Sequence, residues 1–300
     1  MADKGSMLVH RVAVVTLAAT FALIIAGALV TSRDAGLAVP DWPLAYGELN
    51  PPRWYQIENV RTEHGHRIIA ATVALLTALL ALVVLKKEHR RWVRRLALGA
   101  VALVVFQALL GGLRVLSLSL NLAMVHGWTA QAFFSLLVVI TTVTAPGWRG
   151  ERPVAPQSLV RACWALTVLV VVQLASGVLI RHLGPDARPL AGNALFYLHL
   201  LLATGIVWLA ARLSRNEDLG ALARRPADLL LPLAGLQVGL GLASFIITET
   251  MQYDRQATMA ESWLPTFHVA AGAALLAASI ALTTHSLAGR SATLTEEGAT

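Results

Sequence analysis

The sequence TEHGHRIIAATVALLTALLALVVL (residues 62–85) places a cluster of ionisable side chains directly before an apolar run long enough to cross a bilayer. Glu63 and His66 are three residues apart, so on a helix they share one face. Ionisable groups at membrane depth are costly and usually face the protein interior. We therefore expect a transmembrane helix that carries a carboxylate and an imidazole toward an internal site.

Further apolar runs flank this one on both sides. Of the 300 residues, 56% are hydrophobic and 14% are charged, which leaves too little polar surface for a soluble domain. The sequence therefore predicts an all-α polytopic membrane protein with eight transmembrane helices. The predicted spans are Val12–Thr31, His66–Leu85, Leu96–Leu116, Met124–Ala145, Val160–Ile180, Leu195–Leu213, Leu229–Thr248 and Leu264–Thr284.

The first predicted span could also be a secretory signal peptide, because Lys4 and Arg11 precede it and Ala26–Ala28 resembles a cleavage site. Its apolar length of about 19 residues exceeds the usual central region of a signal peptide, so we interpret it as a transmembrane helix. The segment Met1–Leu8 carries Asp3 and has no arginine, which does not fit a mitochondrial transit peptide.

The distribution of basic residues predicts the orientation. With the N-terminus in the cytoplasm, the cytoplasmic segments hold about two thirds of the 24 Lys and Arg residues. This is the positive-inside pattern, and an even number of spans places both termini in the cytoplasm. The net charge of +7 therefore reflects topology and anionic headgroups, and the chain has no soluble basic module that would bind nucleic acid.

The longest predicted connection, Ser32–Arg61, is rich in Pro, Trp and Tyr. Tryptophan and tyrosine prefer the headgroup level of a membrane. This composition predicts either an ordered cap over the outer ends of the helices or an aromatic belt at the interface.

A short repeat relates the two halves of the chain. Gln107–Arg114 in the third span resembles Gln173–Arg181 in the fifth, and Gln237–Gly241 in the seventh repeats the spacing from glutamine to glycine without the arginine. Each segment precedes a span that begins with a histidine. We therefore interpret the chain as two pseudo-repeated four-helix bundles, residues 1–150 and 151–300.

Four histidines lie near the predicted starts of the second, fourth, sixth and eighth spans, each with a small residue four positions later. They are His66, His126, His199 and His268, followed by Ala70, Ala130, Ala203 and Gly272. A small residue one turn below a histidine leaves room for a flat macrocycle. Two imidazoles from facing helices of a bundle can hold haem iron from both sides, so the pattern predicts one haem site in each half.

Three arginines, Arg67, Arg114 and Arg181, lie at the same predicted depth and are candidates to pair with haem propionates. Their alternative role is to anchor helix ends at the membrane interface. A compact copper or zinc site fits less well, because its ligands must converge within about 2 Å of the ion. The single cysteine, Cys163, excludes an intrachain disulfide, a cysteine-rich metal site and an iron–sulfur cluster.

The pattern Glu63-x-x-His66-Arg67, the three later histidines and the Gly-Leu-x-x-x-Asp-Trp-Pro segment at residues 36–43 together resemble the haem A synthase family. The resemblance extends over the eight spans, from Val12 to Thr284. Some bacterial members carry a cysteine pair in the loop after the first span. This chain has none there, so a redox role of that pair is not carried over.

The resemblance implies a stepwise oxidation of the C8 methyl group of haem O to a formyl group, through hydroxylated intermediates, giving haem A for terminal oxidases. It implies that His199 and His268 are the axial ligands of a haem b cofactor in the second half. It also implies that the first half binds the substrate haem, whose iron lies by His66 and His126, with Glu63 as the catalytic carboxylate beside it.

The partners implied by the resemblance are the haem O substrate, the lipid bilayer, a haem O synthase and an electron donor, while homo-oligomerisation is left open. The implied location is the cell (plasma) membrane, with the haem sites near its outer face.

A bis-histidine membrane cytochrome b that only transfers electrons is the main alternative, because it needs the same four histidines. Only the first half has an acid three residues before its histidine, and this asymmetry favours an enzyme. The matching positions before His199 and His268 are Phe196 and Pro265. A haem carrier or transporter ranks third.

Overall fold

The computed structural model describes residues 4–148, 155–182, 192–250 and 257–288. Over these residues the regular structure is helical, apart from an isolated bridge between Ala45 and Glu48. Eight of the helices are long and apolar enough to cross a membrane, which confirms the predicted multi-pass α-helical class. The helices are α1 (Lys4–Ser32), η1 (Trp54–Gln56), α2 (Glu58–Lys87), α3 (Arg91–Ser117), α4 (Leu120–Thr144), α5 (Gln157–Arg181), α6 (Ala194–Ser214), α7 (Ala221–Thr250) and α8 (Met259–Ala288).

The eight long helices follow the predicted spans in order, but each of them is longer than its predicted span. Helix α2 begins at Glu58, eight residues before the predicted start at His66, and α7 begins at Ala221 rather than at Leu229. Hydropathy detects only the part of a helix that lies in the hydrocarbon region, whereas hydrogen bonding continues through polar residues at the membrane surface. Glu63 therefore lies in the second turn of α2 and not at its start.

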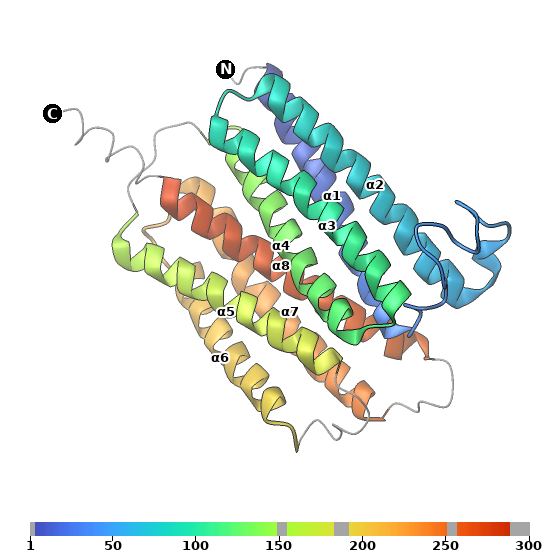
Figure 1. Cartoon of the computed structure of the whole chain (residues 1–300). Helices are drawn as coiled ribbons and strands as arrows, with labels where there is room; N and C mark the ends of the chain where they lie inside the picture. Colours follow the sequence, from blue (N-terminus) through green and yellow to red (C-terminus); the bar gives the residue numbers. More distant parts are fainter. Residues whose placement is uncertain (1–3, 149–154, 183–191, 251–256, 289–300) are drawn as a thin grey trace.

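Helix α8 is the central helix of the bundle. Within its most apolar window 61% of the residues are buried, against 11% for the corresponding window of α7. It contacts α1, α4, α5 and α7, and Figure 1 shows α4 and α8 between the remaining N-terminal and C-terminal helices. The run of small residues at positions 270–273 allows this close packing on several sides.

Buried apolar side chains form two main clusters. One lies within α1–α4 and includes Leu80 and Leu137, neither of which has exposed surface. The other surrounds α5–α8, includes Leu166, and extends to Ile24 of α1 and Phe134 of α4. Helices α1 and α4 therefore contact both clusters and join the first four helices to the last four.

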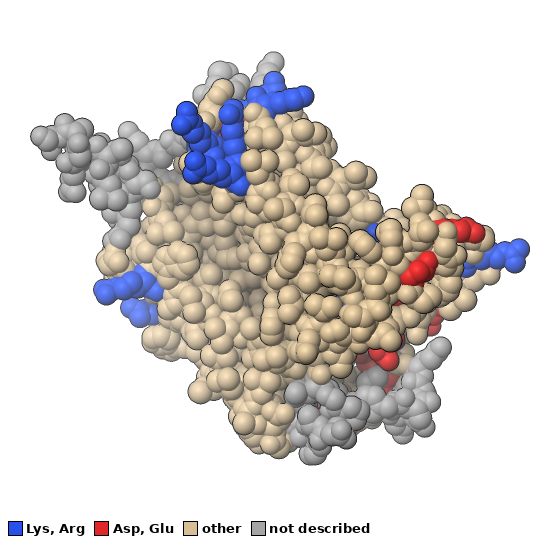
Figure 2. Space-filling view, viewed as in Figure 1, with Lys and Arg blue, Asp and Glu red and all other residues tan. Residues whose placement is uncertain are grey.

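The two ends of the bundle differ in charge and in construction. Figure 2 shows Lys and Arg gathered at the end that carries the α2–α3 turn, and the visible Asp and Glu, with a few Lys or Arg beside them, near the opposite end, by the α1–α2 loop. The α2–α3 turn is fixed by an ion pair in which Arg90 lies 2.7 Å from the buried carboxylate of Glu88. Arg90 also donates to the Val143 carbonyl of α4 at 2.9 Å, which ties the turn to a neighbouring helix.

Candidate functional site

Each of the four histidines lies with its imidazole against a glycine of the preceding helix. The pairs are Gly27 with His66, Gly111 with His126, Gly177 with His199, and Gly241 with His268. A Cβ atom added at these glycines would lie only 2.9–3.4 Å from the Cε1 atom of the imidazole. The glycines are therefore needed for the close approach of imidazole and backbone.

His199 of α6 and His268 of α8 face each other across the second group of helices. Their ring centroids are 6.4 Å apart and their planes are inclined by 56°. Two imidazoles bound to one metal ion, with metal–nitrogen bonds of about 2 Å, would have centroids roughly 6 Å apart. The separation of these two rings therefore fits a single iron atom between them.

Hydrogen bonds set the tautomer of both imidazoles in this pair. Ser176 donates its hydroxyl hydrogen to the Gln173 carbonyl at 2.8 Å, so at His199 it accepts from Nδ1–H, also at 2.8 Å. His268 Nδ1–H donates to the Gln237 carbonyl at 3.2 Å. Each ring therefore keeps its lone pair on Nε2, which is the arrangement that metal-ligating histidines have when their other nitrogen donates to a protein group.

A narrow cavity lies directly below this pair, among α5, α6, α7 and α8. Its lining includes Ala203 and Gly272, the small residues one turn after His199 and His268, as well as Gln173 and Gln237. Within the described residues the buried side-chain oxygens of these two glutamines have no hydrogen-bond partner. The four helices thus leave a small, mostly apolar space beside the imidazole pair, with the two glutamines as the polar part of its wall.

His66 of α2 and His126 of α4 are held differently. The buried Nδ1 atom of His66 has no hydrogen-bond partner among the described residues. With the side-chain amide of Gln107 oriented to satisfy its neighbours, its nitrogen donates to His126 Nδ1 at 3.1 Å. Neither ring therefore shows the Nδ1–H donation to a protein acceptor that His199 and His268 share.

The carboxylate of Glu63 is buried, with 4% of the residue exposed, and both of its oxygens are bound. The backbone N–H of Val39 donates to Oε2 at 2.8 Å. Arg67 donates from Nη2 to Oε1 at 2.7 Å, forming an ion pair on one face of α2. These two donors satisfy an anion that would otherwise be costly to bury.

The three arginines lie near the ends of α2, α3 and α5, and each binds protein groups. Arg67 binds Glu63 and backbone carbonyls of the α1–α2 loop. Arg114 donates to the Gly36 carbonyl of the same loop at 3.3 Å. Arg181 donates to the Ala28 carbonyl at 2.8 Å and to Ser32 Oγ at 2.6 Å. Their pairing with haem propionates stays a prediction.

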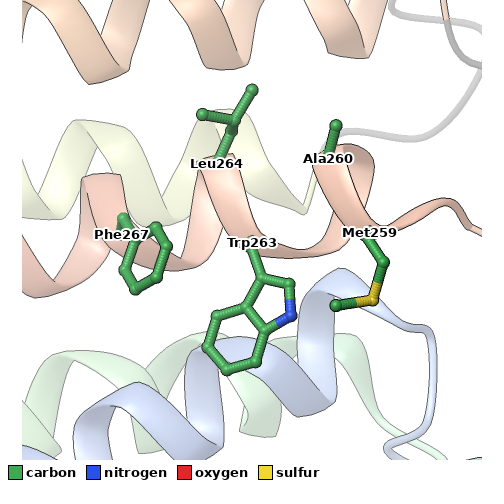
Figure 3. Close-up of a pocket in the computed structure, with 5 residues that line it drawn as sticks. All are labelled: Met259, Ala260, Trp263, Leu264 and Phe267. Atoms are coloured by element: carbon green, nitrogen blue, oxygen red, sulfur yellow. The ribbon is translucent and has the colours of Figure 1, made fainter.

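A separate apolar hollow lies beside the first turns of α8. Figure 3 shows Met259, Ala260, Trp263, Leu264 and Phe267 around it, and its volume is about 550 Å³. The rings of Trp263 and Phe267 stack with centroids 5.3 Å apart. The lining carries no ionisable group, so the hollow supplies no chemistry and fits the lipid-facing surface of a membrane helix.

Sequence reasoning missed the groups that orient the histidines. Ser176 lies inside the repeated segment but has no counterpart at the same place in the other copies. Gly27 was missed because Leu23 stands where the other segments have glutamine. A glycine near the end of every odd-numbered helix is the signal that would have identified it.

Comparison with known proteins gives matches of two kinds. A family model described as cytochrome oxidase assembly protein matches residues 58–190, which include Glu63, His66 and His126. A protein of Alkalihalophilus pseudofirmus named Heme A synthase is 31% identical over 147 residues, and one of Caulobacter vibrioides with the same name is 34% identical over 149 residues. These alignments cover 48% and 46% of this chain, and 48% and 41% of the relatives.

A longer alignment joins the chain to a Heme A synthase of Shewanella oneidensis, at 25% identity over 295 residues, covering 78% of this chain and 86% of the relative. Over these lengths the chain is similar to proteins named Heme A synthase and to the cytochrome oxidase assembly family model. In the two matches above 30% identity, the chain spans about half the length of the curated relatives or less.

Proposed function

We propose that the chain is a haem A synthase, a membrane-bound oxidoreductase that oxidises the C8 methyl group of haem O to a formyl group. The observation that carries the proposal is the buried carboxylate of Glu63 on α2, close to His66 in one half, whereas the matching positions of the other half hold Phe196 and Pro265. A carboxylate that the second histidine pair lacks favours chemistry over electron transfer alone. The names of the related proteins support the same reaction.

The cofactor of this reaction, in our proposal, is a haem b held by His199 and His268. The 6.4 Å separation of the rings and the shared Nδ1–H tautomer support this assignment. When bound, the haem would supply redox chemistry to the second half. The residues around it fix the two imidazoles, and Ala203 and Gly272 line the narrow cavity of about 30 Å³ beside them.

The substrate haem would occupy the first half, by His66 and His126. Neither of these rings is fixed by Nδ1–H donation to a protein acceptor. Weaker orientation of the two imidazoles suits a substrate haem, which must be released after each turnover. Glu63 would accept a proton or stabilise positive charge that develops as the methyl group is oxidised. Arg114 is the arginine best placed to meet a propionate here, because among the described residues it makes only one long hydrogen bond, to Gly36.

We further propose that residues 1–150 and 151–300 are two pseudo-repeated four-helix bundles, with both termini in the cytoplasm and the histidines near the outer face of the cell membrane. The two buried clusters support the division into halves. The basic α2–α3 turn supports the orientation, because Lys and Arg favour the cytoplasmic side. A haem O synthase and an electron donor would be the functional partners, as a supply of substrate and a path for electrons are both needed.

The direct test is pigment extraction after expression of the chain with and without a supply of haem O. We expect haem A, or the hydroxylated haem, only when the chain and haem O are both present. A bis-histidine cytochrome b would instead bind haem and leave haem O unchanged.

The cofactor assignment has its own test in His199→Ala and His268→Ala. Each change removes one axial ligand, so we expect either variant to lose or sharply alter the absorption spectrum of low-spin haem. Purification of both variants with the spectrum of the unchanged protein would show that the ligands lie elsewhere.

A further inference from the structure

Arg67 is the side chain that binds the α1–α2 loop (residues 33–57) most extensively. Its Nη1 atom donates to the carbonyls of Asp41 at 2.7 Å and Leu44 at 3.1 Å. Its Nη2 atom donates to the Val39 carbonyl at 3.0 Å and to Glu63 at 2.7 Å. One guanidinium group therefore joins the buried carboxylate to three points along the loop.

Glu63 contacts the same part of the loop directly. Val39 donates its N–H to Glu63, and its carbonyl accepts from Arg67. Val39 has no exposed surface, so this short ring of hydrogen bonds is shielded from water. The position of the Glu63 carboxylate and the position of the loop are thus fixed together.

The loop reaches the first histidine pair from this anchor. The indole of Trp42 lies so close to Gly112 of α3 that no Cβ atom would fit there. The neighbouring residue on α3, Gly111, is the glycine against which His126 packs. The Arg67-bound segment of the loop thus covers α3 one residue from the glycine against which His126 packs.

Other hydrogen bonds and a ring contact hold the loop independently of Arg67. His64, also on α2, donates from Nε2 to Asn50 Oδ1 at 3.2 Å and packs edge-on against Trp54, with ring centroids 5.0 Å apart. Tyr46 donates its hydroxyl to the Ala38 carbonyl at 2.6 Å. A change at Arg67 would therefore loosen residues 38–46 while Asn50 and Trp54 stay bound to α2.

We propose that Arg67 is a positioning residue, which holds the α1–α2 loop as a lid over the first histidine pair and fixes the Glu63 carboxylate beneath it. The proposal rests on the proposed function in so far as Glu63 takes part in haem oxidation. Arginine suits this role because its planar group presents five N–H donors, enough for three carbonyls and a carboxylate. A lysine ammonium has three donors and cannot serve all four acceptors.

The test compares Arg67→Gln and Arg67→Lys with Arg61→Gln in the full chain in lipid nanodiscs. Arg61 lies on the same helix and makes one long hydrogen bond to the loop, 3.4 Å to the Tyr55 carbonyl, so it is a matched control. Hydrogen exchange is measured for the peptides that cover residues 36–47. Loss of a charge-assisted hydrogen bond should speed exchange there by about tenfold in Arg67→Gln, less in Arg67→Lys, and not at all in Arg61→Gln.

A second readout separates positioning from a structural role. We expect Arg67→Gln to convert bound haem O at a rate at least about tenfold lower, with partial rescue in Arg67→Lys. Unchanged exchange over residues 36–47 would overturn the proposal, and so would faster exchange with unchanged conversion. If the Arg67→Gln protein does not accumulate, Arg67→Lys is used instead. Hydrogen exchange over residues 36–47 that equals that of the unchanged protein would then overturn the proposal. If the unchanged protein converts no haem O, the proposed function fails, and exchange still decides whether Arg67 holds the loop.

Discussion

The contact between imidazole and glycine leaves different amounts of room at the four histidines. A Cβ atom at Gly241 would lie 2.9 Å from His268 Cε1, closer than packed carbon atoms approach, whereas at Gly111 the corresponding distance from His126 is 3.4 Å. His268 therefore has the least tolerance for a larger neighbour. Gly235 and Gly239 lie on the same helix as Gly241, and a Cβ atom at either would meet nothing within 4 Å.

These distances predict different outcomes for the same substitution on one helix. Gly241→Ala should displace His268 and lower the amount of haem that co-purifies, because the ring cannot keep its position. Gly235→Ala should leave the haem content unchanged, since alanine stabilises a helix by about 1 kcal/mol relative to glycine. The haem to protein ratio measures both, and equal ratios in the two variants would argue against the packing of His268 described above.

At this scale the sequence indicates the side chains of the candidate site, whose roles stay a prediction, but not how these side chains are held. Glu63 and the four histidines followed from spacing along helices. The donor and acceptor roles did not, because Ser176 and the Gln237 carbonyl come from neighbouring helices, whose rotation no sequence pattern defines. Arg67 is a similar case, since its partners in the loop are backbone carbonyls that any residue would supply.

The α1–α2 loop is the element whose structure the sequence left most open. Its aromatic residues predicted either an ordered cap or an interfacial belt, and the structure shows it folded against α2 and α3. A tight turn within it depends on Asp41, whose carboxylate accepts from the N–H groups of Tyr46 at 2.7 Å and Gly47 at 2.7 Å. Tyr46 and Gly47 both have positive φ angles, 52° and 78°, so the turn needs this support.

The turn should respond to pH in one direction. Hydrogen bonds from the N–H groups, that of Gly47 first, hold the pKa of the Asp41 carboxyl below its ordinary value of 3.8. Because the pKa of Asp41 is lower in the folded protein, the ionised carboxylate stabilises the turn fully above the pKa of the unfolded chain. This stabilisation is lost as the pH falls through the pKa of the folded protein. We therefore expect the N–H groups of residues 45–47 to stay protected from exchange, relative to an unstructured peptide at the same pH, from neutral pH down to about pH 4, and to lose this protection only below it. The Asp41→Ala variant should lack this protection at neutral pH. Rapid exchange in the unchanged protein at pH 5 would contradict this.

At the scale of the whole molecule, a partly buried polar connection joins the two groups of helices near the site. Arg181, at the end of α5, binds the Ala28 carbonyl and Ser32 at the end of α1, and Ser32 in turn lies 3.1 Å from the Thr266 hydroxyl of α8. A cation near a helix C-terminus also complements the helix dipole.

Removal of this connection should weaken the whole bundle. Arg181→Gln leaves polar groups without their donor, so we expect the free energy of unfolding to fall by about 1–3 kcal/mol. The exposed Arg161, on the same helix, is the control, and Arg161→Gln should change little. Denaturant unfolding in detergent measures both. A loss of equal size in the two variants would show that charge, and not the connection between halves, is responsible.

The architecture as a whole was more predictable than the site. Apolar runs gave the number and order of the helices, because each span must satisfy its own backbone in lipid. They did not give the helix ends, as at Glu58, nor the central place of α8, because its apolar stretch differs little from the others and only tertiary packing decides which helix is surrounded.

The central claim is that Glu63 acts in haem oxidation, and Glu63→Gln tests it most directly. The amide keeps the shape of the side chain and removes the charge. Glu58→Gln is the matched control, since Glu58 lies on the same helix and pairs with Arg33 at 3.1 Å but has 48% of its side chain exposed.

The measurement is the haem content extracted from each variant after expression with haem O. For Glu63→Gln we expect normal amounts of protein and haem b, with haem A formation lower by about 10²–10⁴-fold and haem O or its hydroxylated form accumulating. Glu58→Gln should make haem A normally. Haem A formed by Glu63→Gln at the rate of the unchanged protein would contradict the catalytic role of this carboxylate.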